Sequence, residues 1–343
     1  MNTSYRSQLT GPTVLAIAAL LGACDPPLAP QAQRSTPLTT TNRGPERLVL
    51  QSLPRVPTAA SEVVLRGAWG SGPTQFGRLT EASRPGPMAL DVDRQGRIHV
   101  LDQVNRRVKR YSAAGRLQAV VPLAVDAAAT AEYLRVDGQG SLHLLAVEPG
   151  QPQRWLYHRH SGGTWHTRQL PASLGLPTGI FPARAKEVWV EQRHRWQTRL
   201  RDGARSLGRP DRSRPAARLL ASRAGRHLAR VSRVHQGRYT STLFEVQTTL
   251  PLLAIQELAV GLDGAVYLAL LMGRESGPPA RDMEQVERVM VVRHPAGAHR
   301  VVRLEHGRAT DCNDDLAVSA AGDIYQLFTT KAELRVRRWG VSR

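Results

Sequence analysis

Cysteine and lysine are scarce in this chain of 343 residues, and acidic residues are outnumbered. Only two cysteines occur, Cys24 and Cys312, so a framework of several disulfides is excluded. Lysine supplies three of the 47 basic residues and arginine supplies the rest. So lopsided a ratio indicates GC-rich coding, because arginine codons are GC-rich and lysine codons are not. We therefore interpret the net charge of +19 mainly as a solvated exterior, and we do not expect nucleic-acid binding.

The familiar catalytic signatures are missing as well. The sequence contains no phosphate loop, no dinucleotide fingerprint, no GxSxG elbow and no HExxH helix. Near the N-terminus, the apolar run Val14–Leu21 is too short for a bilayer crossing, which takes about 20 residues. It has the proportions of the apolar region of a secretory signal peptide.

The four residues after this run, Leu21-Gly22-Ala23-Cys24, resemble the lipobox of bacterial lipoproteins, in which the cysteine is diacylated and becomes the mature N-terminus. The resemblance implies a lipoprotein signal peptide over residues 1–23 and lipidation, such as palmitate, at Cys24. Each buried acyl methylene contributes about 0.8 kcal/mol, so several chains anchor a protein firmly. The alternative is an ordinary secretory signal in which Cys24 is incidental. We expect a lipid-anchored protein of the bacterial envelope, periplasmic or on the outer surface, with inner versus outer membrane left open.

Residues 24–61 follow the expected signal peptide. Their central part, Pro26–Pro57, is rich in proline, threonine, alanine and glutamine and shows no sustained period. Such a composition cannot bury a core. We predict a disordered tether over residues 24–61 and a folded body over residues 62–343.

The body is organised around the stretch Pro87–Tyr111. Its apolar residues alternate, first at Leu90 and Val92 and then at Ile98 and Val100, with a glycine-bearing turn between the two runs. Alternation, a turn and renewed alternation predict antiparallel strands joined by short turns. Three or four such strands in succession need neighbouring sheets against which to pack.

The same pattern recurs along the chain. Glycines stand at positions 96, 140, 225, 264 and 322, and Lys186 fills the missing place, which gives spacings of 44, 46, 39, 39 and 58 residues. Six residues before each of these places the residue is apolar: Leu90, Leu134, Ile180, Leu219, Leu258 and Leu316. A period of about 40 to 50 residues, with about four strands in each, is typical of a β-propeller blade, and six units lie within the range that closes into a ring.

The first unit, Leu90–Val108, also resembles the NHL-repeat family in its order of apolar residue, Val, Asp, Gly, Ile, Val, Asp, Asn, Arg and Val. Units two to six keep only the first half of that pattern. We predict an all-β fold, a six-bladed β-propeller of four-stranded antiparallel blades. The last unit shows three strands, at Leu316–Ala320, Asp323–Thr329 and Leu334–Trp339, and we expect Glu62–Ala68 to supply its fourth strand.

Acidic side chains precede several of the predicted innermost strands. We expect the loops that enter these strands to meet at one mouth of the central channel and to bring together Glu132, Glu257, Asp311, Asn313, Asp314 and Asp315. Oxygen ligands from several loops suit Ca²⁺, so Glu132, Glu257, Asn313 and Asp314 are candidate metal ligands, and Asp311 and Asp315 are candidate ligand-binding residues. Six-bladed lactonases of the gluconolactonase family, which this arrangement resembles, hold a divalent metal at such a mouth. Alternatively, these residues only satisfy turn backbone.

Other candidates have plainer interpretations. Large rings three residues after the glycine positions are expected to pack between blades: His99, His143, Trp189, Tyr267 and Tyr325. The spacing of His158, His160 and His166 is too loose for a convincing metal site. Cys312 is expected to be a buried or loop thiol. The nine arginines of Arg193–Arg218 are expected on an exposed strand and loop, and the alternative is a groove for single-stranded nucleic acid or an anionic surface. Met272–Arg288 is expected as an insertion in blade five.

Together these features favour a lipid-anchored, monomeric binding or scaffolding module for a protein, peptide or glycan. The alternative is a metal-dependent propeller hydrolase or lyase, lactonase-like, that uses the acidic mouth. A third possibility is that the basic exterior binds nucleic acid or lipid headgroups. Enzymatic activity is the less favoured expectation, and the sequence does not identify the ligand.

Overall fold

The structure is a computed structural model that describes residues 45–57, 60–80, 84–124, 127, 130–182, 187–210, 217–235, 237–275 and 283–340. The predicted signal peptide, Cys24 and the first part of the predicted tether lie outside these residues. Residues 44–343 form one compact unit. Apart from two short 3-10 turns, Leu50–Ser52 and Ala172–Leu174, the regular elements of the described residues are strands.

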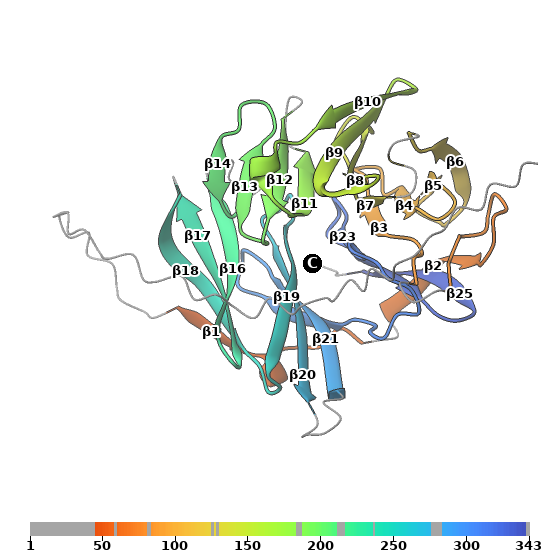
Figure 1. The fold of residues 1–343 in the computed structure, drawn as a ribbon. Helices are drawn as coiled ribbons and strands as arrows, with labels where there is room; N and C mark the ends of the chain where they lie inside the picture. Colours follow the sequence, from red (N-terminus) through yellow and green to blue (C-terminus); the bar gives the residue numbers. More distant parts are fainter. Residues whose placement is uncertain are drawn as a thin grey trace, which may run out of the picture. The chain divides into compact units, whose positions relative to one another are not determined.

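The strands form six sheets, which are the blades of a propeller (Figure 1). Blade 1 contains β3 (Ala89–Val92), β4 (Ile98–Asp102), β5 (Arg107–Tyr111) and β6 (Leu117–Pro122). Blade 2 contains β7 (Ala131–Val136), β8 (Leu142–Glu148), β9 (Gln151–Ser161) and β10 (Thr164–Gln169). Blade 3 contains β11 (Pro177–Pro182), β12 (Val188–Gln192), β13 (Trp196–Arg199) and β14 (Arg205–Leu207).

Blades 4, 5 and 6 form the second half of the ring, and blade 4 has five strands. Blade 4 contains β15 (Arg209–Pro210), β16 (Arg218–Gly225), β17 (Leu228–His235) and β18 (Arg238–Gln247), with β1 (Glu46–Val49) as a fifth strand. Blade 5 contains β19 (Leu252–Val260), β20 (Val266–Glu275), β21 (Met283–Arg293) and β22 (His299–Arg303). Blade 6 contains β23 (Leu316–Val318), β24 (Ile324–Thr329), β25 (Glu333–Trp339) and β2 (Ser61–Ala68). The predicted six-bladed, all-β propeller is confirmed.

The glycine positions mark the turn between the first two strands of a blade. Gly96, Gly140, Gly264 and Gly322 have φ between +75° and +90°, a conformation that glycine adopts without steric cost. In blade 1 the preceding Asp93 closes the turn, because its Oδ1 accepts the backbone N–H groups of Gln95 (3.0 Å) and Arg97 (2.9 Å). Blade 4 differs, since its hairpin turns two residues later and Gly225 pairs with Leu228 inside the ladder.

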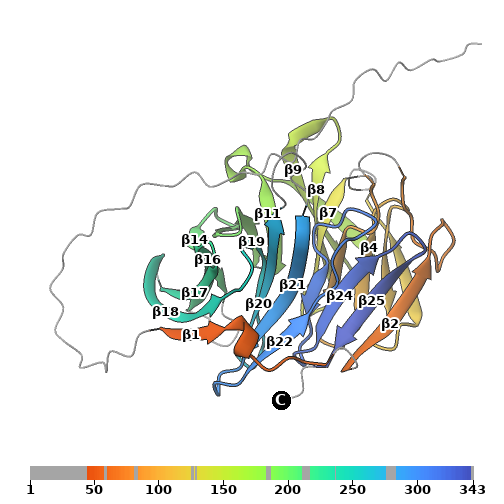
Figure 2. The same cartoon turned by 90° about the horizontal axis from the view of Figure 1, so that it is seen from below.

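The predicted closure of the ring is confirmed. Strand β2 pairs antiparallel with β25, from Ser61 opposite Trp339 to Ala68 opposite Glu333, so the N-terminal strand completes the last blade (Figure 2). The loop after β2 is held by blade 1, where Asp102 accepts the N–H of Gly77 at 2.9 Å. Asp102 also binds Asn105 at 3.0 Å, so the Asp/Asn pair that only the first unit carries fastens the junction between blades 6 and 1.

The prediction of a disordered tether over residues 24–61 is wrong for its last part. Strand β1 pairs in parallel with β18, from Glu46 opposite Phe244 to Val49 opposite Gln247. Leu48 and Leu50 are 6% and 3% exposed in the core between blades 4 and 5. Burying each side chain stabilises the fold by about 1.5–3 kcal/mol, which offsets the entropy lost on ordering this segment. The folded body therefore begins near residue 45 rather than at residue 62.

Apolar side chains fill the spaces between neighbouring blades. Separate clusters join blades 6 and 1, 1 and 2, 2 and 3, 4 and 5, and 5 and 6. At the junction of blades 3 and 4 the cluster is small, with Leu207, Leu220 and Val234. The cyclic side chains three residues after the glycine positions are buried, as predicted: His99, His143, Trp189, Tyr267 and Tyr325 are all at most 7% exposed.

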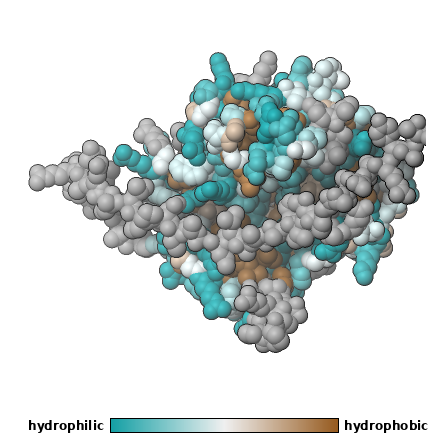
Figure 3. All heavy atoms as spheres, in the orientation of Figure 1, coloured by the Kyte–Doolittle hydropathy of each residue, from teal (hydrophilic) through white to brown (hydrophobic). Residues whose placement is uncertain are grey.

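In the space-filling view, hydrophilic residues lie at several places on the visible face, and apolar residues show between them (Figure 3). Among the described residues, none belongs to a helix with the length and apolar character needed to cross a membrane. The predicted insertion Met272–Arg288 is a continuation of the β20–β21 hairpin, whose tip at 276–282 lies outside the described residues.

Candidate functional site at the channel mouth

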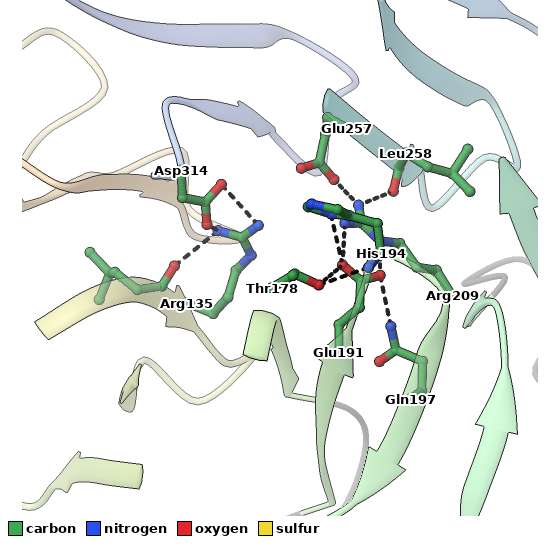
Figure 4. Close-up of polar contacts among 10 residues, drawn as sticks. Arg135, Thr178, Glu191, His194, Gln197, Arg209, Glu257, Leu258 and Asp314 are labelled. Carbon is green, nitrogen blue, oxygen red and sulfur yellow. Dashed lines mark hydrogen bonds and ion pairs between the residues drawn. The ribbon is translucent and has the colours of Figure 1, made fainter. Parts of the chain in front are cut away.

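Two largely buried arginines from different blades reach the centre of the ring. Arg135 comes from β7 of blade 2, and Arg209 comes from β15, the extra short strand inside blade 4. Their guanidinium carbons lie 5.7 Å and 4.7 Å from the centroid of the Phe181 ring. Both arginines belong to the group of polar residues at the end of the channel where the innermost strands begin, which we call the mouth face (Figure 4).

Arg209 joins three blades. It donates from Nε and Nη2 to the two carboxylate oxygens of Glu191 at 2.6 Å and 2.8 Å, and from Nη1 to Glu257 and to the carbonyl oxygen of Leu258. Gln197 also donates to Glu191, at 2.9 Å. Although burial raises the pKa of Glu191, the charge and hydrogen bonds of Arg209 outweigh it and hold that pKa at about 2. The blade 3 to blade 4 junction, poor in apolar contacts, is therefore fastened by ion pairs.

Arg135 connects blades 2 and 6 across blade 1. It donates to the carbonyl oxygen of Leu134 at 3.0 Å and to both carboxylate oxygens of Asp314. Burial raises the pKa of Asp314 to about 7, against the lowering effect of Arg135 and with a further raising effect of Glu257. Asp314 and Glu257 thus lie within each other's electrostatic field, as the sequence predicts, but each carries an arginine partner.

The neighbouring Asp315 is also paired. It accepts from Arg288 at 2.7 Å and lies 3.3 Å from Arg308. Burial raises the pKa of Asp315, but hydrogen bonds and charge from Arg288 bring it below the usual value. The side chain of Gln256, on β19 of blade 5, also accepts a hydrogen bond from Arg288.

Glu132 and Asn313 meet as predicted. Asn313 Nδ2 donates to Glu132 Oε2 at 2.8 Å, and burial raises the pKa of Glu132 to about 7 against that hydrogen bond. Asp311 does not join the group, because its side chain is exposed and its backbone N–H donates to the carbonyl oxygen of Arg84 at 3.0 Å. Buried Cys312 donates to Met88 O at 3.2 Å, and burial raises the pKa of its thiol to about 12, as fits an inert thiol.

The predicted metal site gains no support from this arrangement. In the part of the chain that the structure describes, no three His, Cys, Asp or Glu residues are placed to hold a metal ion. The oxygens proposed as Ca²⁺ ligands at Glu257 and Asp314 already accept from arginine. The loosely spaced His158 has a different role, since its Nδ1 lies 2.9 Å from Thr167 Oγ1 across a blade 2 hairpin.

Sequence reasoning missed the two central arginines. Arg209 falls in the segment expected on the exterior, yet it is 7% exposed. The one local indication is Gly208, which has a φ of +79° and comes so close to Leu219 that an added Cβ would lie 2.6 Å from its carbonyl oxygen. Arg135 follows an ordinary strand alternation and has no distinguishing signal among 44 arginines.

A second group of side chains comes from blades 3 and 4, with Trp196, Arg205 and Tyr239 on their outer strands β13, β14 and β18, and we call it the rim patch: Leu176, Arg195, Trp196, Arg205 and Tyr239. Leu176, Trp196 and Tyr239 are 58%, 38% and 53% exposed. Arg195 Nη2 donates to the Tyr239 hydroxyl at 3.1 Å, and the guanidinium of Arg205 lies 5.2 Å from the Trp196 ring centroid.

The turn that carries the patch is strained and fixed. Arg193 and His194 have φ of +51° and +53°, which costs a non-glycine residue about 1–2 kcal/mol each. The His194 N–H donates to Thr178 Oγ1 at 2.9 Å, and His194 Nδ1 lies 3.5 Å from Glu191 (Figure 4). The rim patch is thereby connected to the Arg209 network.

No protein-family model and no curated protein matches this sequence. Among solved structures, a glucose dehydrogenase is similar with a TM-score of 0.49 and 11% identity, over 83% of this chain and 100% of that one. Streptogramin B lyase matches with a TM-score of 0.42 and 14% identity, over 76% and 95%. Virginiamycin B lyase from Staphylococcus aureus matches with 0.42 and 13%, over 77% and 98%. At these values the likenesses carry no inference about function, and the NHL resemblance of the first unit stays a prediction.

Proposed function

We propose that this protein is a lipid-anchored module of the bacterial envelope whose propeller binds an acidic protein or peptide through the rim patch. The observation that carries the proposal is the pairing of two exposed aromatic rings with two arginines, Tyr239 with Arg195 and Trp196 with Arg205. Tryptophan, tyrosine and arginine are the residues that most often dominate the energetics of protein interfaces.

The charge of the patch indicates the chemistry of the partner. Within the described residues, neither Arg195 nor Arg205 forms an ion pair with a carboxylate, and their recorded partners are the two aromatic side chains. Such guanidinium groups bind carboxylates with two parallel hydrogen bonds. A partner with aspartate or glutamate beside an apolar side chain for Leu176 would complement the patch.

The floor of the patch is well suited to binding because it is already ordered. The turn from Arg193 to Arg195 is held by Thr178, and the strand that leads into it contains Glu191, which Arg209 and Gln197 fix. A surface that is rigid before association loses less conformational entropy when a partner docks. Binding therefore fits this geometry better than metal-dependent hydrolysis, which needs free oxygen ligands where the structure has arginine-paired carboxylates.

The binding proposal is tested by fluorescence anisotropy on the mature full chain. The probes are a labelled pool of Asp/Glu-rich peptides that also contain Leu and Phe, and a control pool with Lys in place of the acids. We expect binding of the acidic pool only. Trp196→Ala and Tyr239→Ala should each weaken it by about 30-fold, as for interface residues worth about 2 kcal/mol. Leu262→Ala removes an equally exposed side chain (49%) from a turn at the opposite face and should have no effect.

Two results would overturn the binding proposal. One is equal affinity of the Trp196→Ala, Tyr239→Ala and Leu262→Ala variants. The other is tighter binding of an oligothymidylate probe with steep salt dependence, which would indicate nucleic acid. The anchor is tested separately, because Cys24→Ser should move the protein from the detergent phase to the aqueous phase in a partition experiment. A wild-type protein that stays in the aqueous phase would refute the anchor and leave the binding proposal standing.

A further inference from the structure

A cleft of about 280 Å³ opens between neighbouring sheets, and we call it the blade 1–2 cleft. Four side chains of blade 1 and two of blade 2 line it: His99, Val108, Arg110, Val121, Leu142 and His160. The turns that contain Gln139 and Gly162 also border it, and because both residues are exposed, the cleft is open to solvent. It shares no residue with the rim patch or with the central arginine network.

The polar residues of blade 1 in this lining point toward blade 2. His99 pairs across the ladder with Arg110, so their side chains leave the same face of the sheet. Leu101 and Val108, each two residues from one of them along its strand, belong to the apolar cluster that joins blades 1 and 2. Residues two apart in a strand share a face. His99 and Arg110 therefore face the cleft rather than blade 6.

His99 presents a hydrogen-bond acceptor to the cleft. Its Nε2 lies 3.0 Å from Asp93 Oδ2. Burial raises the pKa of Asp93, but hydrogen bonds from His99 and Arg97 outweigh it and bring that pKa to about 2, so the carboxylate only accepts. Nε2 therefore carries the proton, and Nδ1 of the neutral imidazole keeps a lone pair. His99 is 2% exposed, and within the described residues its Nδ1 has no hydrogen-bond partner.

A donor without a partner lies on the neighbouring strand. In the part of the chain that the structure describes, Nε of Arg110 is buried and makes no hydrogen bond. A buried polar atom without a hydrogen bond is destabilising, so such atoms usually have a ligand or a partner. A hydroxyl group could satisfy both atoms at once, because it donates one hydrogen bond and accepts others.

The equivalent position of blade 2 shows which hydroxyl fits. His143 also stands three residues after its turn glycine, and its Nε2 lies 3.1 Å from Asp137. Its Nδ1 lies 2.8 Å from the hydroxyl of Tyr157. Burial lowers the pKa of His143 and raises that of Tyr157 to about 12, so a neutral imidazole accepts from a phenol. The two rings also stack, with 5.9 Å between their centroids and 28° between their planes.

The counterpart of Tyr157 in blade 1 is Val108. Each pairs with the residue two positions after the histidine of its blade. Valine has neither a ring nor a hydroxyl, so within the described residues His99 lacks both the stacked ring and the donor that His143 has. The cleft lies beside Val108. The substitution within the repeat has thus left space for a phenol next to a buried acceptor.

We propose that the blade 1–2 cleft binds a phenol, either a small free molecule or the tyrosine side chain of a peptide, in the way that blade 2 holds its own Tyr157. The phenol hydroxyl donates to Nδ1 of His99 and accepts from Nε of Arg110. Its ring lies against the imidazole and against Val108. A carboxylate or a phosphate dianion suits the cleft less well, because neither can donate to Nδ1.

The proposal is tested by titrating the mature full chain with p-cresol, which is the tyrosine side chain as a free molecule. Toluene lacks the hydroxyl, and p-methylanisole has an oxygen that cannot donate. Calorimetry should show binding of p-cresol at one site and about tenfold or more weaker binding of the other two, since both leave the buried nitrogen unsatisfied. In NMR spectra p-cresol should shift the Nδ1 resonance of His99 and leave that of His143 unchanged.

Two exchanges between the blades provide the sharper variants. Val108→Tyr should fill the cleft with its ring, bond to His99 and abolish p-cresol binding. Its matched control is Val120→Tyr, which adds the same ring to a 39% exposed side chain on the other face of blade 1 and should leave binding unchanged. The reverse exchange, Tyr157→Val, should open a second site, so p-cresol should raise the Tm of this variant more than that of the wild type.

N-acetyltyrosine amide distinguishes the source of the phenol. Binding of this compound as well as p-cresol would indicate a tyrosine side chain, and binding of p-cresol alone would indicate a small free phenol. The proposal would be overturned by a wild-type protein that does not bind p-cresol or that binds p-methylanisole equally well. Binding of p-cresol that shifts no resonance of His99, or that Val108→Tyr leaves intact, would overturn it too.

Discussion

Replacement of Arg209 by methionine tests whether ion pairs hold the ring together where its apolar core is thinnest. Methionine keeps the length of the side chain and can still lie against Phe181, but it cannot donate to Glu191, Glu257 or Leu258. Glu191 is fully buried and Glu257 nearly so, at 0% and 12% exposure of their side chains. Both carboxylates would lose their cation without gaining water.

The expected loss follows from the burial of the pair. Removing one partner of a buried ion pair costs about 3–5 kcal/mol. With an unfolding entropy of about 2.1 cal/mol/K per residue, a body of 300 residues has an unfolding entropy of about 0.6 kcal/mol/K. Arg209→Met should therefore lower the Tm by about 5–8 °C. Arg303→Gln breaks an exposed pair with Glu287, worth at most about 1 kcal/mol, and should lower it by less than about 2 °C.

The pH dependence separates charge from packing. In the wild type the pKa of Glu191 is about 2, below its ordinary value of 4.5, so its stabilising effect is present above pH 4.5 and is lost as the pH falls toward 2. Without Arg209, burial raises the pKa of Glu191. At low pH Glu191 is then protonated, and the variant no longer buries an unpaired charge there. The difference in Tm should be largest at about pH 7 and should shrink at about pH 4. A deficit that is the same at both values, or no larger than that of Arg303→Gln, would refute the electrostatic explanation.

Three further changes test other parts of the structure. Gly115→Ala should destabilise by about 2 kcal/mol more than Gly163→Ala in denaturant unfolding, because both have positive φ but only at Gly115 would the new Cβ meet a neighbour, the Val64 carbonyl oxygen at 1.9 Å. Glu132 has a raised pKa of about 7, so wild-type stability should fall as the pH rises from 4.5 through 7, and Glu132→Gln should lack this loss in melting curves. Leu48→Ala should speed hydrogen exchange of the β1 amides by about 30-fold or more, since the lost burial is worth about 2 kcal/mol or more; unchanged protection would contradict the role of β1.

The fold was predictable because its signals are periodic and local. The strand alternation recurs along the chain, and four units also have a glycine at positive φ in the first turn. An aspartate closes that turn in units 1 and 2. Together these signals specify a blade wherever the chain repeats them. Unit 4 departs from this pattern, because Gly225 pairs with Leu228 in the strand ladder and does not lie in the turn.

The candidate site was predictable only in part, because an ion pair across blades leaves no mark in the sequence. Glu257 and Asp314 hold adjacent places in the repeat, and the structure brings both into the electrostatic field of Arg135. Their partners Arg209 and Arg135 are 48 and 179 residues away in the chain. No spacing rule connects residues so far apart, and an excess of arginine hides the two that are buried.

Part of the segment that was predicted to be a tether takes part in closing the ring. Residues 46–68 contact three consecutive blades, since β1 pairs with β18 of blade 4, Val56 donates to Val301 of blade 5 at 2.8 Å, and β2 pairs with β25 of blade 6. This segment secures blades 4 and 5 to the blade that closes the ring. An anchor upstream of residue 45, as we propose at Cys24, would pull first on the four-residue strand β1. The eight-residue strand β2, on which closure depends, would bear load only after β1 had separated.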